Sequence, residues 1–222
     1  MAGTATAGLG GLAGRAPTLA GVSTNRLETF ADGVFAIAAT LLILNVDAQV
    51  GDVHDLGARV AHIWPSYLAY AVSFVTIGIM WLNHHTVLTQ IERADRRFLL
   101  ANVGLLLCIA FVPFPTRLVA EHIRGEGARE AALTYGFTMV ATAIMFSVTW
   151  FYACGRRRLL RADADPAIVS GLTRSYLPGP WIYLGATLLA FASPTASVIV
   201  FMATALFYVI ESSIFGNAPP AD

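Results

Sequence analysis

Six stretches of predominantly apolar residues follow one another along the chain, and each is about as long as a helix that crosses a lipid bilayer. A transmembrane α-helix needs about 20 such residues. Only 13% of the 222 residues are charged, whereas a soluble globular domain has roughly 25%. We therefore predict an all-α membrane protein with six transmembrane helices, at about residues 27–46, 58–82, 98–120, 131–153, 172–192 and 195–215.

These six helices would form one membrane domain, residues 26–216, between two tails. Residues 1–25 are mostly Gly, Ala, Thr and Ser, so we expect a flexible cytosolic N-terminal tail. Residues 217–222 are a short C-terminal tail. The chain has no Lys, and its 14 Arg balance its 14 acidic residues. This balance argues against a nucleic-acid partner, which would need a basic face.

Prolines predict irregular backbone in two of the helices. Pro113 and Pro115 fall inside the third, where proline removes a helical hydrogen bond, so we expect a bend whose freed carbonyls find partners on a neighbouring helix. Pro178 and Pro180 lie near the start of the fifth. That helix should begin only at Trp181 or be kinked, because proline is tolerated in the first turn but not in the interior.

Arginines predict the orientation in the membrane. The connections 83–97 and 154–175 carry three and five Arg, whereas the connection 47–57 carries acidic residues and no Arg. The third connection is an exception, with three Arg beside three Glu. Because loops rich in Arg remain on the cytosolic side, we predict a multi-pass protein of the cell membrane with both termini in the cytosol.

Asp32 is the residue of the first helix that most needs explaining. It lies inside an apolar segment, where a carboxylate costs about 2–3 kcal/mol and should have a partner. The predicted topology places it at the depth of Trp81, Asn83, His84, His85 and Asn102. We expect a polar cluster that joins three helices. It would either hold the helices together or take part directly in permeation or proton sensing.

Three segments of the chain resemble the transmembrane protein 175 family of potassium channels. The first is Arg26-x-x-x-Phe30-Ala31-Asp32, followed by small and branched apolar residues. The others are 81–85, which reads Trp-Leu-Asn-His-His, and Asn102 with the later run 111–116, which reads Phe-Val-Pro-Phe-Pro-Thr. The likeness covers roughly residues 26–120. Ala31 departs from the family pattern, which has serine there, and so removes a hydroxyl from the network between helices.

The resemblance implies a homotetrameric potassium channel, with the first helix of each subunit around the axis. The family's pore positions correspond to Ile37, Leu41 and Leu44, with Thr40 beside them. The pattern alone would equally suit a helix that faces lipid or another helix. The resemblance also implies an inter-helix network made of Arg26, Phe30, Asp32, Trp81, His84, His85 and Asn102.

A ring of four Ile37 side chains would form a hydrophobic constriction that gates by dewetting. Such a ring should favour K⁺ moderately over Na⁺, because K⁺ gives up its hydration shell more easily, and Thr40 hydroxyls could supply replacement oxygens. Asp47 would either concentrate cations at the outer mouth or be an ordinary solvated loop acid. We expect no cofactor and no bound metal, with K⁺ as the permeant ion and lipids and other copies of the chain as partners.

Two alternatives remain from the residues. Asp32, His84 and His85 have the chemistry of a proton relay, so a proton-conducting or proton-coupled transporter is the second hypothesis. An enzyme is disfavoured, because adjacent histidines on a helix point about 100° apart and share one metal poorly. The run 134–137, Thr-Tyr-Gly-Phe, resembles a carbonyl selectivity filter only faintly, because it lies at the start of a predicted spanning helix.

Overall fold

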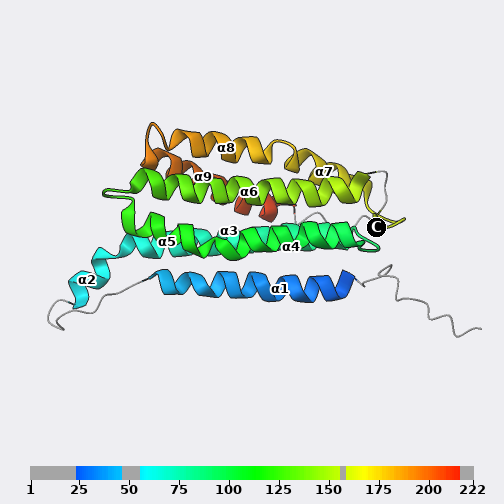
Figure 1. The fold of residues 1–222 in the computed structure, drawn as a ribbon, viewed down its shortest axis with the longest axis horizontal. Coiled ribbons are helices and arrows are strands. Elements are labelled where there is room, and N and C mark those ends of the chain that lie inside the picture. Colours follow the sequence, from blue (N-terminus) through cyan, green and yellow to red (C-terminus); the bar gives the residue numbers. More distant parts are fainter. Residues whose placement is uncertain (1–23, 47–55, 156–158, 216–222) are drawn as a thin grey trace, which may run out of the picture.

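The computed structural model describes residues 24–46, 56–155 and 159–215, and every regular element in them is helical. Figure 1 shows the long helices running side by side as a bundle. The all-α prediction is therefore confirmed. The elements are α1 (Thr24–Leu41), η1 (Leu42–Asn45), α2 (Leu56–His62), α3 (Trp64–Thr89), α4 (Arg96–Phe111), α5 (Pro113–His122), α6 (Ala128–Cys154), α7 (Pro166–Tyr176), α8 (Gly179–Leu189) and α9 (Pro194–Phe215).

Four helical segments of the described chain are long and apolar enough to cross a membrane: Thr24–Asn45, Trp64–Thr89, Arg96–His122 and Ala128–Cys154. Three of them match the first, third and fourth predicted spans to within a few residues. The second predicted span, 58–82, is displaced, because α3 begins at Trp64, six residues after the predicted start, and ends seven residues after the predicted end. Residues 56–62 form the separate helix α2. The fifth predicted span is divided between α7 and α8, and the apolar part of α9 is the shorter stretch Pro194–Tyr208. The count of six spans therefore remains a prediction.

The two predicted interruptions, in the third and fifth spans, lie at the prolines. The third span is broken between α4 and α5, where the Val112 N–H donates to the Ile109 carbonyl at 3.1 Å in a tightened turn. Pro113 begins α5, as proline can at a first helical position. In the fifth span, α7 ends at Tyr176 and α8 begins at Gly179. The helix α8 thus begins two residues before the predicted start at Trp181.

The central helix of the bundle is α6, which packs against α4 and α5 on one side and α8 and α9 on another. In Figure 1, α1 lies at one edge of the bundle, and α3 and α4 separate it from α6. The core between these helices is apolar. It includes Phe35 and Leu42 of the first span with Ile77 of α3 and Leu105 and Ile109 of α4.

The connections after α3 and after α6 meet at one end of the bundle. The Glu92 N–H donates to the Leu159 carbonyl and the Arg161 N–H to the Gln90 carbonyl, each at 2.9 Å. Arg161 also holds Asp163 through two hydrogen bonds of 2.9 and 3.1 Å, which lowers the pKa of that carboxyl below its usual value. The predicted connections 83–97 and 154–175, which carry three and five Arg, therefore lie together at the end where α1 begins (Figure 1).

Close packing explains why the run 134–137 is helical. These residues are part of α6, and Gly136 lies directly against Thr187 of α8. A Cβ atom added at Gly136 would be 2.5–2.9 Å from three side-chain atoms of Thr187, so only glycine fits here without a shift. In this segment Tyr135 is buried. Gly136 therefore allows α6 and α8 to pack closely together. This packing role agrees with the interpretation that residues 134–137 are not a selectivity filter.

Candidate functional site

The first helix has one buried face and one bare face. Leu27, Ala31, Phe35 and Ala38 recur every three or four residues and are almost completely buried. This spacing puts them on one side of a helix, where they contact α3 and α4. The opposite side has no neighbour within the described chain. The site is therefore built on a helix that is anchored along one face only.

The predicted pore positions all lie on the bare face. Ile37 is 60% exposed, Leu41 43% and Leu44 67%, although all three are large apolar side chains. Thr40 is exposed beside them. Large apolar side chains on α4 and α8 are just as exposed, as expected for helices next to lipid. Exposure alone thus allows this stripe to face lipid, another copy of the chain or a pore.

The Thr40 hydroxyl is held by its own helix. It donates to the backbone carbonyls of Ala36 and Ile37, at 2.9 and 3.0 Å. Because the hydroxyl proton is directed back into the helix, the oxygen lone pairs remain available on the bare side. The arrangement suits an oxygen that accepts from water or coordinates a cation.

Asp32 finds its partner on α3. The Trp81 indole Nε1–H donates to the Asp32 carboxylate at 2.8 Å. The partner is a neutral donor, and Asp32 is exposed within the single chain. Beside this pair, the Trp81 ring stacks on His85, whose Nδ1 lies 2.9 Å from the carboxylate of Glu28. Two carboxylates of α1 are thereby tied to α3.

His84 is bonded to α4 and packs against α1. Its ring nitrogen Nε2 lies 3.0 Å from the Asn102 side-chain oxygen. The Asn102 amide nitrogen donates to the Phe98 carbonyl, which fixes the amide orientation. The His84 ring also contacts Phe35, with centroids 5.5 Å apart. Since His84 and Asn102 are both buried, this group connects three helices inside the bundle.

The two adjacent histidines serve different contacts. His84 points to Asn102 inside the bundle, whereas His85 points to Glu28 at the half-exposed edge. Within the described residues no group of three His, Cys, Asp or Glu side chains is placed to hold a metal ion. The separation follows from the 100° rotation between successive helical residues.

Other predicted residues lie apart from this network. Arg26 is exposed, and Phe30 is 59% exposed on the same stripe as Ile37. Ala31, where the family pattern has serine, is fully buried against the core. Asp47 lies outside the described residues.

Two polar contacts of the first span were missed from the sequence. The Asn45 side-chain amide, which is buried, donates to the Pro113 carbonyl at 2.8 Å, at the break between α4 and α5. Glu28 is the second, as the partner of His85. A signal for Asn45 was available, because an amide within an apolar run needs a partner. The carbonyl that Pro113 leaves without its helical donor is that of Ile109, and it accepts from the Val112 N–H of the same span. The Asn45 bond to the Pro113 carbonyl is therefore a separate contact.

A sequence profile of the family described as endosomal/lysosomal potassium channel TMEM175 matches residues 26–113. A potassium channel from Chamaesiphon minutus is 40% identical over 193 residues, which cover 86% of this chain and 95% of that protein. The chain belongs to the TMEM175 family. The resemblance found in residues 26–120 is thus confirmed, and it extends over most of the chain.

A solved structure gives the same fold for the family. The crystal structure of a lysosomal potassium-selective channel TMEM175 homolog from Chamaesiphon minutus aligns with a TM-score of 0.77 at 38% identity, over 88% of this chain and 98% of that chain. A rat relative, named endosomal/lysosomal proton channel TMEM175, is 31% identical over 210 residues, which cover 87% of this chain and 40% of that protein. The matched TMEM175 names therefore include both potassium and proton channels.

Proposed function

We propose that this TMEM175-family chain forms a potassium-selective channel that conducts K⁺ passively across the cell membrane. The observation that carries the proposal is the match over most of the chain to a potassium-selective channel of known structure. The bare stripe of Ile37, Leu41 and Leu44, on a helix whose opposite face is anchored, is the surface that we assign to the pore. The full-length bacterial relative is named a potassium channel. In this chemistry the protein transports an ion and catalyses no reaction.

The pore requires several copies of the chain, which we propose to be four. The bare stripe lies on the outside of the single chain, so a closed path forms only when α1 helices of different subunits face one another. A groove of about 370 Å³ runs beside it, lined by Ala36 and Ala39 of α1 and by Gly78 of α3. Small residues let helices approach closely in a membrane. The groove can therefore receive a helix of the neighbouring subunit.

Ion selection would depend on the constriction and on Thr40. Four Ile37 side chains form an apolar ring that water leaves readily, and an ion passing it must shed part of its hydration. K⁺ sheds water more easily than Na⁺, so the ring favours K⁺ moderately. The Thr40 oxygens, with their protons bonded inside the helix, replace part of the lost water. Leu41 and Leu44 extend the dry segment.

The orientation follows from the end at which the arginines gather. The paired connections near Gln90 and Arg161 carry the largest number of Arg, and α1 begins at that end. Positive charge marks the cytosolic side, so we place both termini in the cytosol. The sixth predicted span and the α7–α8 segment complete six helices per subunit, with lipids around the outside.

The experiment is a flux assay on purified protein in liposomes, with K⁺ or Na⁺ as the permeant ion. Ile37→Asn places an amide in the constriction. We expect faster flux and a smaller preference for K⁺, because the ring is no longer dry. Ile144→Asn is the matched control, since Ile144 is 44% exposed on α6, away from α1. It should leave both rates near those of the wild type.

Results from the wild-type protein or from the two variants can contradict the proposal. If folded, oligomeric wild-type protein passes no K⁺, the channel function fails. If Ile37→Asn and Ile144→Asn change the flux equally, Ile37 does not lie in the pore. A K⁺ flux with unchanged selectivity in Ile37→Asn would move the constriction elsewhere on the stripe.

A proton pathway is the second candidate, and one observation favours it. The groups Glu28–His85 and Asp32–Trp81 form a continuous polar edge between α1 and α3. In the same liposomes, a proton flux without K⁺ movement would support it. Loss of that flux in His85→Gln, with K⁺ flux absent throughout, would place the relay at this edge.

A further inference from the structure

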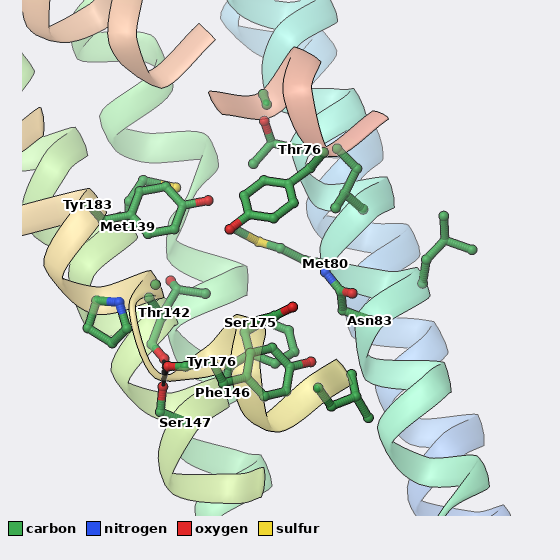
Figure 2. Close-up of a pocket in the computed structure, with 18 residues that line it drawn as sticks. Thr76, Met80, Asn83, Met139, Thr142, Phe146, Ser147, Ser175, Tyr176 and Tyr183 are labelled. Carbon is green, nitrogen blue, oxygen red and sulfur yellow. Dashed lines mark hydrogen bonds between the residues drawn. The ribbon is translucent and has the colours of Figure 1, made fainter. Parts of the chain in front are cut away.

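A cavity of about 290 Å³ lies on the side of α3 that faces away from α1 (Figure 2). It is enclosed by α3, α6, α7, α8 and α9. Met80 and Asn83 of α3 line one wall, and Met139 and Phe146 of α6 line another. The proposed pore uses neither wall. The cavity is therefore a separate feature of each subunit.

The break between α7 and α8 forms part of the cavity wall. Ser175 and Tyr176 line it from the end of α7, and Gly179 and Pro180 from the start of α8. The Ser147 hydroxyl donates to the Tyr176 carbonyl at 2.9 Å, and the Tyr176 ring stacks on Phe146 with centroids 5.8 Å apart. Figure 2 shows these contacts at one end of the cavity. The Tyr176 side chain is thus firmly held.

The Tyr176 hydroxyl lacks a partner within the described part of the chain, although it is buried from solvent. An unsatisfied buried hydroxyl costs about 1–3 kcal/mol. Tyr208 of α9 also lines the cavity. A group that enters the cavity and hydrogen-bonds to the Tyr176 hydroxyl would remove that cost.

The lining determines which ligand fits. Among the described residues that line it there is no Arg, Asp, Glu or His, so these residues would not compensate the desolvation of a charged ligand. The methionine and phenylalanine walls suit an apolar body, and methionine adapts its shape to what it contacts. The volume is at the small end of ligand pockets, about 300 Å³. The fitting chemistry is one small apolar body with one neutral hydroxyl.

We propose that this cavity binds a small neutral amphiphile whose hydroxyl hydrogen-bonds to Tyr176 while its apolar body packs against Met80, Met139 and Phe146. The ligand is either a free phenol-like molecule or the hydroxyl-bearing end of a neutral single-chain lipid. Both present the same chemistry to the cavity.

The position of the cavity links it to the pore helix. Met80 and Asn83 face the cavity, whereas Trp81 and His84, on the other side of the same turns, contact α1. An occupant that shifts this part of α3 also shifts the contacts to Asp32 and Phe35. Occupancy of the cavity should therefore change ion flux. This effect on flux rests on the proposed channel function, but the binding of the ligand does not.

The test measures binding of 4-propylphenol to the full chain in lipid nanodiscs by calorimetry, with empty nanodiscs to correct for partition into lipid. We expect saturable binding. Tyr176→Phe keeps the ring and removes only the hydroxyl, so affinity should fall by about fivefold to tenfold, the effect of one hydrogen bond. Tyr70→Phe is the control, because Tyr70 does not line the cavity, and it should bind like the wild type.

A second variant fills the cavity. Ala143→Leu places three more carbon atoms at a lining position and should abolish binding. If Ala143→Leu does not fold, the affinity of Tyr176→Phe still tests the proposal. A monoacylglycerol that displaces the phenol would identify the lipid source; phenol binding without displacement would identify the free molecule. Absence of saturable binding, or equal affinity in Tyr176→Phe and wild type, would overturn the proposal. Binding without any K⁺ flux would defeat only the proposed channel.

Discussion

Replacing Gly136 with alanine tests how closely α6 and α8 approach. The new Cβ would be 2.5 Å from Thr187 Oγ1, 2.7 Å from Cγ2 and 2.9 Å from Cβ. Rotating the threonine side chain can move the first two atoms but not its Cβ, which is attached to the backbone. Moving that pair from 2.9 Å to an ordinary contact of 3.4 Å requires the helices to separate by about 0.5 Å.

Two effects of opposite sign determine the size of the change. Overpacking of this kind costs typically about 1–3 kcal/mol. Alanine in place of glycine within a helix contributes up to about 1 kcal/mol of stability. We expect Gly136→Ala to lower the free energy of unfolding by about 1–2 kcal/mol, measured by thermal or denaturant unfolding in detergent.

A matched control lies on the partner helix. Gly185 of α8 is exposed, and no atom lies within 4 Å of the position that an added Cβ would take, so Gly185→Ala keeps the helix-forming benefit without the clash. It should be neutral or stabilising. Adding Thr187→Ala to Gly136→Ala removes two of the three clashing atoms and should restore part of the loss.

The reasoning is refuted if Gly136→Ala is as stable as the wild type or more stable, because the helices would then not be in contact here. The same variant also tests whether residues 134–137 take part in ion selection. If the segment 134–137 were a carbonyl filter, Gly136→Ala would change the K⁺ to Na⁺ flux ratio. We expect that ratio to remain unchanged in the protein that folds.

Two further predictions concern polar contacts that anchor the first span, Thr24–Asn45, to its neighbours. Trp81→Phe removes the indole donor to Asp32 and should cost about 1.5–3 kcal/mol, as for hydrogen bonds to charged groups; unfolding in detergent measures the loss, and no change would show that water replaces the donor fully. Asn45→Ala removes the bond to the Pro113 carbonyl and should cost about 1 kcal/mol. Unfolding in detergent measures the stability of this variant, and K⁺ flux in liposomes shows whether the Asn45 contact also positions the proposed constriction. A change in flux without a change in stability would contradict the prediction that Asn45 mainly stabilises the fold.

The positions of helices and breaks could be predicted closely from the sequence. The α4–α5 break occurs at Val112, next to Pro113, because proline removes a backbone donor wherever it is placed. The α7–α8 break was expected near Pro178 for the same reason. Its consequence was not foreseen: each half-helix is only 11 residues long, so neither half alone is long enough to span a bilayer.

The partners of polar residues were harder to predict. Asp32 was expected to join α3 and does contact Trp81, but the pairing of His85 with Glu28 and of Asn45 with Pro113 was missed. Topology gives the depth of each side chain in the membrane. It does not give the rotation of one helix relative to the next, on which each contact depends.

The sequence by itself determined the helical character, the length of each apolar run, the site of each break and the end where arginines gather. These properties follow from local rules, since in lipid a backbone must satisfy its own hydrogen bonds and a span must match the bilayer. The tertiary structure alone decided which face of α1 is buried, leaving Ile37, Leu41 and Leu44 bare. That choice depends on how side chains from three helices pack together, which no single helix specifies.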